Sequence, residues 1–410
     1  MKFNRSGNKI TFPEKLHLSD IDEALASIHQ ATSVAGYRDV MLNFANTKIV
    51  APEFMLAICD YMYELRTKDI DANLIFPADL KLSRLFSNTN WAYHIDPSNH
   101  AQSDFKGFKQ VPATLFENTQ QQSDAVSNIV NVLLSSSNGI ERGDFVAFEW
   151  AINEITDNVL MHANSGRGLV QVSKFHHKQK KISFVVCDSG DGIPKTLRKG
   201  IPTIKSDMEA LMQSIEEGVT RDKTKGQGNG LFGSYQICTA SGGKFQIRSG
   251  NAFLEADNRD KITKNTKVPY NGTIIVSEID FSIPNLLENA LKFEGKTYTP
   301  WTRIEKRYED EKEDKINFVM KNESTAFGNR LAGEFVRSKL QNPINMHNSY
   351  TCVIDLSGID IISSSFADEV FGKIFLTLGM DAYQKIIKII NANEICEKII
   401  NKSLKQRNAL

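Results

Sequence analysis

The sequence predicts an α/β protein with three parts: a central α/β sandwich, with a mixed, mostly antiparallel sheet and helices on one face, between two small α/β domains. Three observations indicate this. The chain has 410 residues, and a typical domain has roughly 150. At both ends, apolar runs of strand length alternate with amphipathic helix patterns. The middle instead shows two long helix patterns, then strands and glycine-rich loops.

The composition is that of an ordinary globular protein, with 41% apolar and 24% charged residues. Basic and acidic side chains number 49 each, so no net charge favours nucleic acid or anionic membrane as a partner. The five cysteines are scattered without a CxxC pair, which argues against a disulfide framework or a zinc site. No apolar run has the length of a membrane span or signal peptide. We expect a cytoplasmic protein.

The domain boundaries follow from changes in pattern. Residues 1–100 alternate strand and helix, and residues 101–117 are polar and linker-like. Residues 118–284 form the largest block. Residues 285–314 are expected to be a linker, whose charged stretch "WTRIEKRYEDEKEDKI" favours a solvated linker or surface helix over a binding tail. Residues 315–410 repeat the first pattern: positions 40–58 align with 352–370 without a gap, although few residues are identical.

The central stretch "NEITDNVLMHA" predicts a helix in which Glu154 and Asn158 lie one above the other, one turn apart. A carboxylate can orient a water molecule, and an amide oxygen beside it can ligate Mg²⁺. A solvated helix face is the alternative interpretation of this pair alone.

The strand pattern "KISFVVCD" ends at Asp188, and "SGDGIP" then turns the chain with Gly190 and Gly192. A carboxylate at a strand end can accept the amino group of adenine, and the glycines allow the backbone to pass close to a flat base. A plain turn is the alternative.

The loop "GQGNGL" has alternating glycines before a helix expected from Leu231. Backbone N–H groups at a helix N-terminus form a cradle for phosphate; a flexible loop is the alternative. The pattern lacks the Lys-Ser/Thr of a P-loop and the preceding strand of a dinucleotide fold. The glycines are Gly226, Gly228 and Gly230, and the basic residues just upstream, which can meet terminal phosphates, are Arg221, Lys223 and Lys225.

In order and spacing, these motifs over residues 118–283 resemble the GHKL ATP-binding superfamily of type II topoisomerases, heat-shock chaperones, mismatch-repair proteins and histidine kinases. Within it, the anti-sigma-factor serine kinases are most similar. "NEITDNVLMHA" resembles the N box, "DSGDGIP" and "GQGNGL" the two glycine boxes, and "GTIIV" the closing strand. The resemblance implies that Glu154 is the general base, that Asn158 binds Mg²⁺, and that Asp188 binds adenine.

The resemblance also implies a nucleotide-binding role for the glycines and for Lys225, Leu231 and Thr273, under a mobile lid at residues 195–225. His162 matches a frequent histidine of the serine-kinase N box, although a structural role is favoured. The pair His176–His177 lies in a strand pattern, so a sensor histidine kinase is not expected.

The stretch "CVIDLSGIDIISSSFADEVFG" resembles STAS domains, the fold of anti-sigma-factor antagonists, and places Ser364 at the phospho-acceptor position. The usual Asp and Gly around that serine are missing, and the alternative role for Ser364 or Ser365 is a helix N-cap. The equivalent N-terminal loop, "VAPEF", has Pro52 at the expected helix start and no hydroxyl. That domain is expected to be a docking or structural element.

Together these features predict a Mg-ATP-binding regulator that hydrolyses ATP slowly to switch the pairing of its STAS-like domains, or of a partner protein. A protein-serine kinase is one alternative, and a non-catalytic nucleotide sensor or scaffold is another. The expected partners are ATP with Mg²⁺ and a protein or second copy that binds the STAS-like domains; membrane and nucleic acid are not expected.

Overall fold

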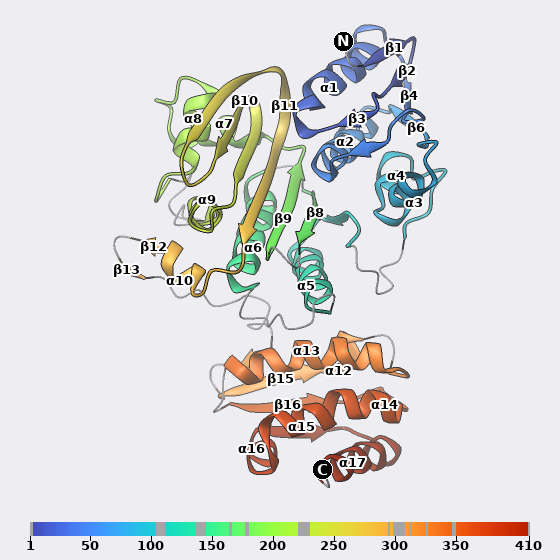
Figure 1. Ribbon diagram of the computed structural model, residues 1–410, viewed down its shortest axis with the longest axis vertical. Coiled ribbons are helices and arrows are strands. Elements are labelled where there is room, and N and C mark those ends of the chain that lie inside the picture. The colour runs from blue at the N-terminus through green and yellow to red at the C-terminus, as the bar shows by residue number, and fades with distance from the viewer. Residues whose placement is uncertain are drawn as a thin grey trace. The chain divides into compact units, whose positions relative to one another are not determined.

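The computed structural model describes residues 3–103, 111–135, 145–163, 166–176, 180–219, 230–293, 296–297, 308–310, 313–324, 327–346 and 350–408. The chain divides into two compact units, residues 1–300 and residues 301–410 (Figure 1). The first unit contains the N-terminal domain and the central sandwich. The second contains the C-terminal domain.

The N-terminal domain has a four-stranded sheet in the order β1-β2-β4-β6. The pair β1–β2 is antiparallel, while β2, β4 and β6 are parallel. Its core is aromatic: the rings of Phe12 and Phe44 stack with centroids 4.0 Å apart. The elements are β1 (Asn4–Ser6), β2 (Lys9–Thr11), β3 (Lys15–Leu16), α1 (Ile21–His29), β4 (Asp39–Asn43), β5 (Ile49–Val50), α2 (Pro52–Arg66), β6 (Asp71–Ile75), α3 (Leu80–Asn88) and α4 (Trp91–Ile95).

The central domain has a five-stranded sheet in the order β10-β11-β9-β8-β7, in which every neighbouring pair is antiparallel. This confirms the predicted α/β sandwich, although β7 lies within residues 101–117, where a linker was expected. The elements are β7 (Thr114–Phe116), α5 (Thr119–Ser135), α6 (Val146–His162), β8 (Gly168–His176), β9 (Lys181–Asp188), α7 (Gly192–Gly200), α8 (Asp207–Ser214), α9 (Gly230–Ala240), β10 (Phe245–Ala256), β11 (Lys261–Asp280), α10 (Leu286–Ala290), β12 (Lys292–Phe293) and β13 (Lys296–Thr297).

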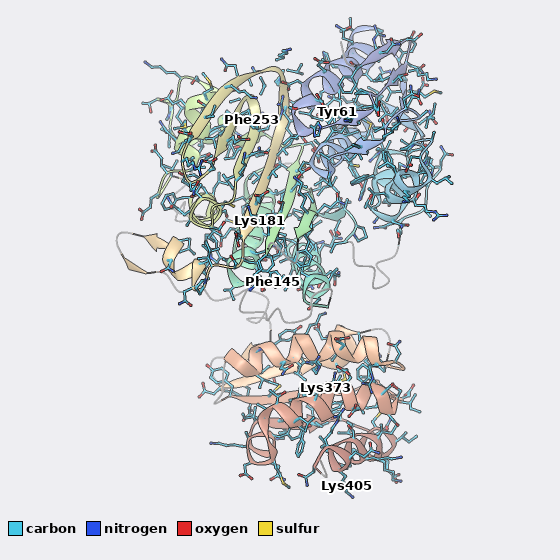
Figure 2. All side chains as sticks on the ribbon, in the orientation of Figure 1. Tyr61, Phe145, Lys181, Phe253, Lys373 and Lys405 are labelled. Carbon is cyan, nitrogen blue, oxygen red and sulfur yellow. The ribbon has the colours of Figure 1, made fainter. Side chains whose placement is uncertain are left out.

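The two faces of this sheet have different coverings. On one face, α6 packs on β9 through an edge-to-face contact of Phe148 with Phe184, at 5.3 Å between centroids. Phe145, labelled in Figure 2, extends this aromatic layer at the start of α6. On the other face, Val185 and Cys187 join the hydrophobic core of the N-terminal domain, and α2 lies against β8 and β9 (Figure 1). Since side chains alternate along a strand, β9 is buried on both sides. The sequence predicted only the helical layer.

The C-terminal unit has a sheet in the order β14-β15-β16-β17, with β14 antiparallel and the other three strands parallel. Strand order and directions are the same as in the N-terminal sheet. The elements are β14 (Glu309–Asp310), β15 (Lys315–Val319), α12 (Met320–Glu323), α13 (Arg330–Met346), β16 (Thr351–Asp355), α14 (Ser364–Ala367), a π-helical turn (Asp368–Gly372), α15 (Lys373–Leu378), α16 (Met380–Ile386), β17 (Ile387–Ile390) and α17 (Glu394–Asn408).

The ungapped alignment of the two small domains is realised in the structure. Strands β4 and β16 begin at the aligned positions Asp39 and Thr351, and helices α2 and α14 begin at Pro52 and Ser364. Part of the charged stretch expected as a linker or surface helix is instead the edge strand β14, because its backbone pairs with β15. The expected alternation of strands and helices is otherwise present in this domain.

Candidate nucleotide site

Helix α6 carries the first motif. Glu154 and Asn158 are both half-buried on this helix. Its rotation is held by Gln122 of α5, whose amide donates to Asn153 Oδ1 (3.2 Å) and Thr156 Oγ1 (2.7 Å) inside the helical layer. Buried hydrogen bonds of this kind are costly to leave unmade. They therefore fix the rotation of α6 and the direction in which Glu154 and Asn158 point. The side chain of His162 lies outside the described residues.

Helix α9 begins directly against this motif. A Cβ added at Gly230 would collide with the Glu154 carboxylate, and one added at Gly233 would collide with the Trp150 ring. The last glycine of the second glycine motif therefore lies in contact with the predicted base, and the half-buried Leu231 follows it in the helix. Lys225, Gly226 and Gly228, together with Arg221 and Lys223, lie outside the described residues.

The first glycine motif turns against the other end of α6. Asp188 is 4% exposed at the end of β9, and its Oδ1 accepts the backbone N–H of Gly190 at 2.9 Å. The Ala163 carbonyl, just beyond α6, accepts the N–H of Asp191 at 2.6 Å and occupies the space that a Gly190 side chain would need. The N box and the first glycine motif thus form one packed unit.

Thr273 lies directly across from Asp188 in the register of β11 and β9, and its hydroxyl and N–H both favour the ionised carboxylate. Ser249 of the next strand extends this row. Its hydroxyl accepts the Ile193 N–H at 2.9 Å and donates to the Gly272 carbonyl at 2.6 Å. The sequence reasoning missed Ser249 and Gly272. The Asn-Gly pair before Thr273 was a signal for the glycine, whereas nothing local marked the serine.

Gly272 has no room for a side chain. Its φ is +112°, and a Cβ there would collide with the backbone carbonyl of Asp188. Such a φ strongly favours glycine. Close approach of β11 to the end of β9 therefore depends on this residue.

Burial is the main cause, and the nearby charge of Asp60 the second cause, that together raise the pKa of Asp188 to about 8. Hydrogen bonds from Gly190 and Thr273 act in the opposite direction. A buried carboxyl with a strongly raised pKa at a strand end is typical of a functional site. Its oxygen can accept a hydrogen bond from a ligand's amino group.

The expected lid region has folded structure in its first part. Residues 195–219 include most of α7 and all of α8. Arg198 pairs with Asp207 at 2.6 Å, and Asp207 also accepts the Asn251 N–H at 2.8 Å, which anchors α8 to β10. Residues 220–225 lie outside the described part of the chain.

The donors available for Mg²⁺ are limited. Within the described ranges, no group of three His, Cys, Asp or Glu side chains forms a protein-only metal site. Asn158 makes no hydrogen bond with another described residue, so its amide oxygen is available as a hard ligand. This donor set fits Mg²⁺ held largely by phosphate and water oxygens, the arrangement that this ion commonly adopts.

In the C-terminal domain, Ser363, rather than Ser364 or Ser365, caps helix α14: its Oγ accepts the Phe366 N–H at 3.0 Å. Ser364 is exposed at the first position of the helix. The capping role expected for Ser364 or Ser365 is therefore wrong, because the loop places the preceding serine at the cap.

In the described part of the chain, no helix is both long and apolar enough to cross a membrane.

Comparison with known protein families agrees with this geometry. Residues 143–281 match the family of histidine kinase-, DNA gyrase B- and HSP90-like ATPases. Residues 332–395 match a STAS-like domain of unknown function. No curated protein matches the chain. The anti-sigma-factor kinase subtype stays a prediction. The chain thus contains a GHKL-type ATPase domain at residues 143–281, followed by a STAS-like domain at residues 332–395.

Proposed function

We propose that this protein is a cytoplasmic, Mg-ATP-binding regulator that hydrolyses ATP slowly, and so switches the pairing of its STAS-like domains or of a partner protein. The contact between Glu154 and Gly230 carries this proposal. It brings a carboxylate of the N box to the start of α9, where backbone N–H groups at a helix N-terminus favour phosphate. A water molecule bound to the Glu154 carboxylate beside the start of α9 would meet both a base and an anion site.

The other residues have separate roles in this proposal. Asp188 accepts the adenine amino group, and Thr273 helps to hold the base. Asn158 holds Mg²⁺, which neutralises phosphate charge when bound. The second glycine motif, with Lys225, Gly226 and Gly228, surrounds the phosphates together with Gly230 and Leu231. Glu154 accepts the proton of the attacking water.

The test measures phosphate release at saturating Mg-ATP. Glu154→Gln is expected to lower the rate by about 100-fold or more, the scale of general-base catalysis, while Mg-ADP affinity stays unchanged. The control Gln120→Ala changes an exposed side chain of α5 and should behave as wild type. Equal rates for Glu154→Gln and wild type would remove the catalytic assignment of Glu154, and a wild-type rate at background would favour a nucleotide sensor without hydrolysis. Normal Mg-ATP affinity in Asn158→Ala would remove the metal assignment.

A protein-serine kinase is the second candidate, because Ser364 is exposed and Ser363 supplies the cap in its place. The γ-phosphate would then pass to a serine hydroxyl, with Glu154 accepting its proton. The test follows label from γ-labelled ATP onto the chain. Label that is lost in Ser364→Ala but kept in Ser365→Ala would support transfer to Ser364, while unchanged label in Ser364→Ala would exclude that acceptor.

A further inference from the structure

A buried acidic residue of the N-terminal domain lies behind the nucleotide site. Asp60 is 1% exposed on α2 (the helix marked by Tyr61 in Figure 2), which packs on β8 and β9. Its Oδ2 accepts a 2.8 Å hydrogen bond from the hydroxyl of Tyr270, which is 2% exposed on β11. Because both groups are excluded from water, this bond joins the two domains strongly.

Tyr270 lies at one end of a bulge in β11 that contacts the backbone of Asp188. In the pairing of β10 with β11, Thr273 is opposite Ser249 but Tyr270 is opposite Gly250, so two residues of β11 bulge out between them. One of these is Gly272, whose backbone lies against the Asp188 carbonyl. Bulges commonly direct side chains at functional sites. The Asp60–Tyr270 bond therefore ties down the strand that carries Thr273.

Helix α2 also reaches the other side of Asp188. Arg167 Nη2 donates to the hydroxyl of Ser189, the next residue after Asp188, at 3.4 Å. The guanidinium of Arg167 lies over the ring of Tyr63 on α2, at 5.2 Å from the centroid. Arg167 and Ser189 both favour the ionised form of Asp60. Two backbone segments that flank Asp188 are thus held by α2.

We propose that Asp60 is a positioning residue of the nucleotide site. It holds the β11 bulge and the Ser189 turn around Asp188, and thereby links adenine binding to the packing of the N-terminal domain on the central sheet. This inference rests on the proposed function, because it assumes that Asp188 binds adenine. Nucleotide affinity then depends on a residue of the N-terminal domain.

The charge of Asp60 gives this role a distinct signature. Asp60 faces Tyr270, Ser189, Arg167 and Glu64, and burial is the largest cause that raises its own pKa, to about 7. The groups that act on Asp188 are the Asp60 carboxyl, the Gly190 N–H, and the Thr273 N–H and hydroxyl. An adenine amino group favours the ionised Asp188, so affinity should rise with pH up to about 8. Removing the Asp60 charge moves that rise to lower pH.

The experiment titrates Mg-ADP into the full-length chain by calorimetry, from about pH 6 to about pH 9. Asp60→Asn keeps an oxygen for Tyr270 but removes the charge; its affinity profile is expected to move to lower pH by roughly one unit. Tyr270→Phe keeps the carboxyl but breaks the bond; its affinity is expected to fall about three- to tenfold. The control Trp91→Phe removes another buried hydrogen bond of the same interface, from Trp91 Nε1 to Gln171 Oε1 at 2.9 Å, and should change neither quantity.

The outcomes separate this inference from the proposed function. If wild type fails to bind Mg-ADP, the proposed function falls and this inference falls with it. If wild type binds but Asp60→Asn and Tyr270→Phe both show the wild-type profile and affinity, only the role of Asp60 is overturned. Equal losses in all three variants would also overturn it, because Asp60 would then contribute only to the stability of the interface.

Discussion

Gly230, the first residue of α9, lies directly against the carboxylate of Glu154 on α6, with no space for a methyl group between them. Two motifs from distant parts of the chain therefore meet at one contact. A side chain at residue 230 would force the Glu154 carboxylate to move, whereas the helix itself would accept alanine there.

Gly230→Ala is expected to displace the Glu154 carboxylate and lower the rate of phosphate release. A displacement of about 1 Å costs on the order of 100-fold in rate. Stability should change little, since alanine favours the helix. The measurement is phosphate release at saturating Mg-ATP, together with the unfolding midpoint in urea. Gly328→Ala is a matched control, because no heavy atom lies within 4 Å of a Cβ added there. A Gly230→Ala variant with the wild-type rate would contradict the contact's role.

Asp188→Asn is expected to weaken Mg-ADP binding by about 1 to 3 kcal/mol, the range for loss of a charged hydrogen-bond partner. It should also reduce the preference for ADP over GDP, since guanine has a carbonyl where adenine has its amino group. Calorimetry with both nucleotides checks this. Asp191→Asn changes a nearby carboxylate that pairs with Lys195 and Lys199 and should keep wild-type affinity. An unchanged ADP preference in Asp188→Asn would refute the adenine assignment.

The two buried carboxyls, Asp60 and Asp188, should make the free energy of unfolding depend on pH. The folded-state pKa of Asp60 is raised to about 7 and that of Asp188 to about 8, mainly by burial. The folded chain therefore holds protons that the unfolded chain has lost above its ordinary pKa near 4, and stability falls as pH rises toward 8. His94 acts oppositely, because burial lowers its pKa to about 4; its contribution rises with pH and is complete above its ordinary value of 6.5.

Above pH 6.5, then, His94 adds no slope, and the two buried carboxyls are expected to lower stability as pH rises. Urea unfolding of the nucleotide-free chain is expected to show stability falling between about pH 6.5 and about pH 8, with a shallower fall in Asp60→Asn. His94 is common to both proteins and cancels in the comparison. Identical slopes in the two proteins would mean that Asp60 is ionised in the folded state throughout this range.

The STAS-like domain has a buried ionic centre at Glu369, which is 1% exposed and pairs with Lys373 at 2.6 Å and Arg337 at 3.3 Å. Glu369→Ala removes the shared partner of these cations, which are partly exposed and can turn to water, and is expected to cost about 1 to 3 kcal/mol. Glu394→Ala removes an exposed i,i+4 pair with Lys398 and should cost less than about 1 kcal/mol. Amide hydrogen exchange in β16 reports both values. A cost for Glu369→Ala no larger than the control would show that the centre does not stabilise this domain.

Local periodicity was sufficient to place much of the candidate site on its helix and strand. A helix of 3.6 residues per turn places Glu154 and Asn158 on one face whatever surrounds it. The strand pattern, followed by two glycines, likewise locates the end of β9 at Asp188. The same local patterns predicted the paired strand-loop-helix units of the two small domains, so their aligned starting positions are present in the structure. These features depend only on residues close together in the sequence.

Contacts between distant segments were decided by the tertiary structure. The apolar run at residues 184–187 requires burial on both faces of β9. Because the hydrophobic effect is non-directional, the run does not identify the element that covers each face. Only the fold shows that α2 covers the second face and brings Asp60 behind Asp188. The capping role of Ser363 and the row from Asp188 through Thr273 to Ser249 were likewise set by loop geometry and strand register. Sequence spacing by itself determined the motifs, and three-dimensional packing determined their neighbours.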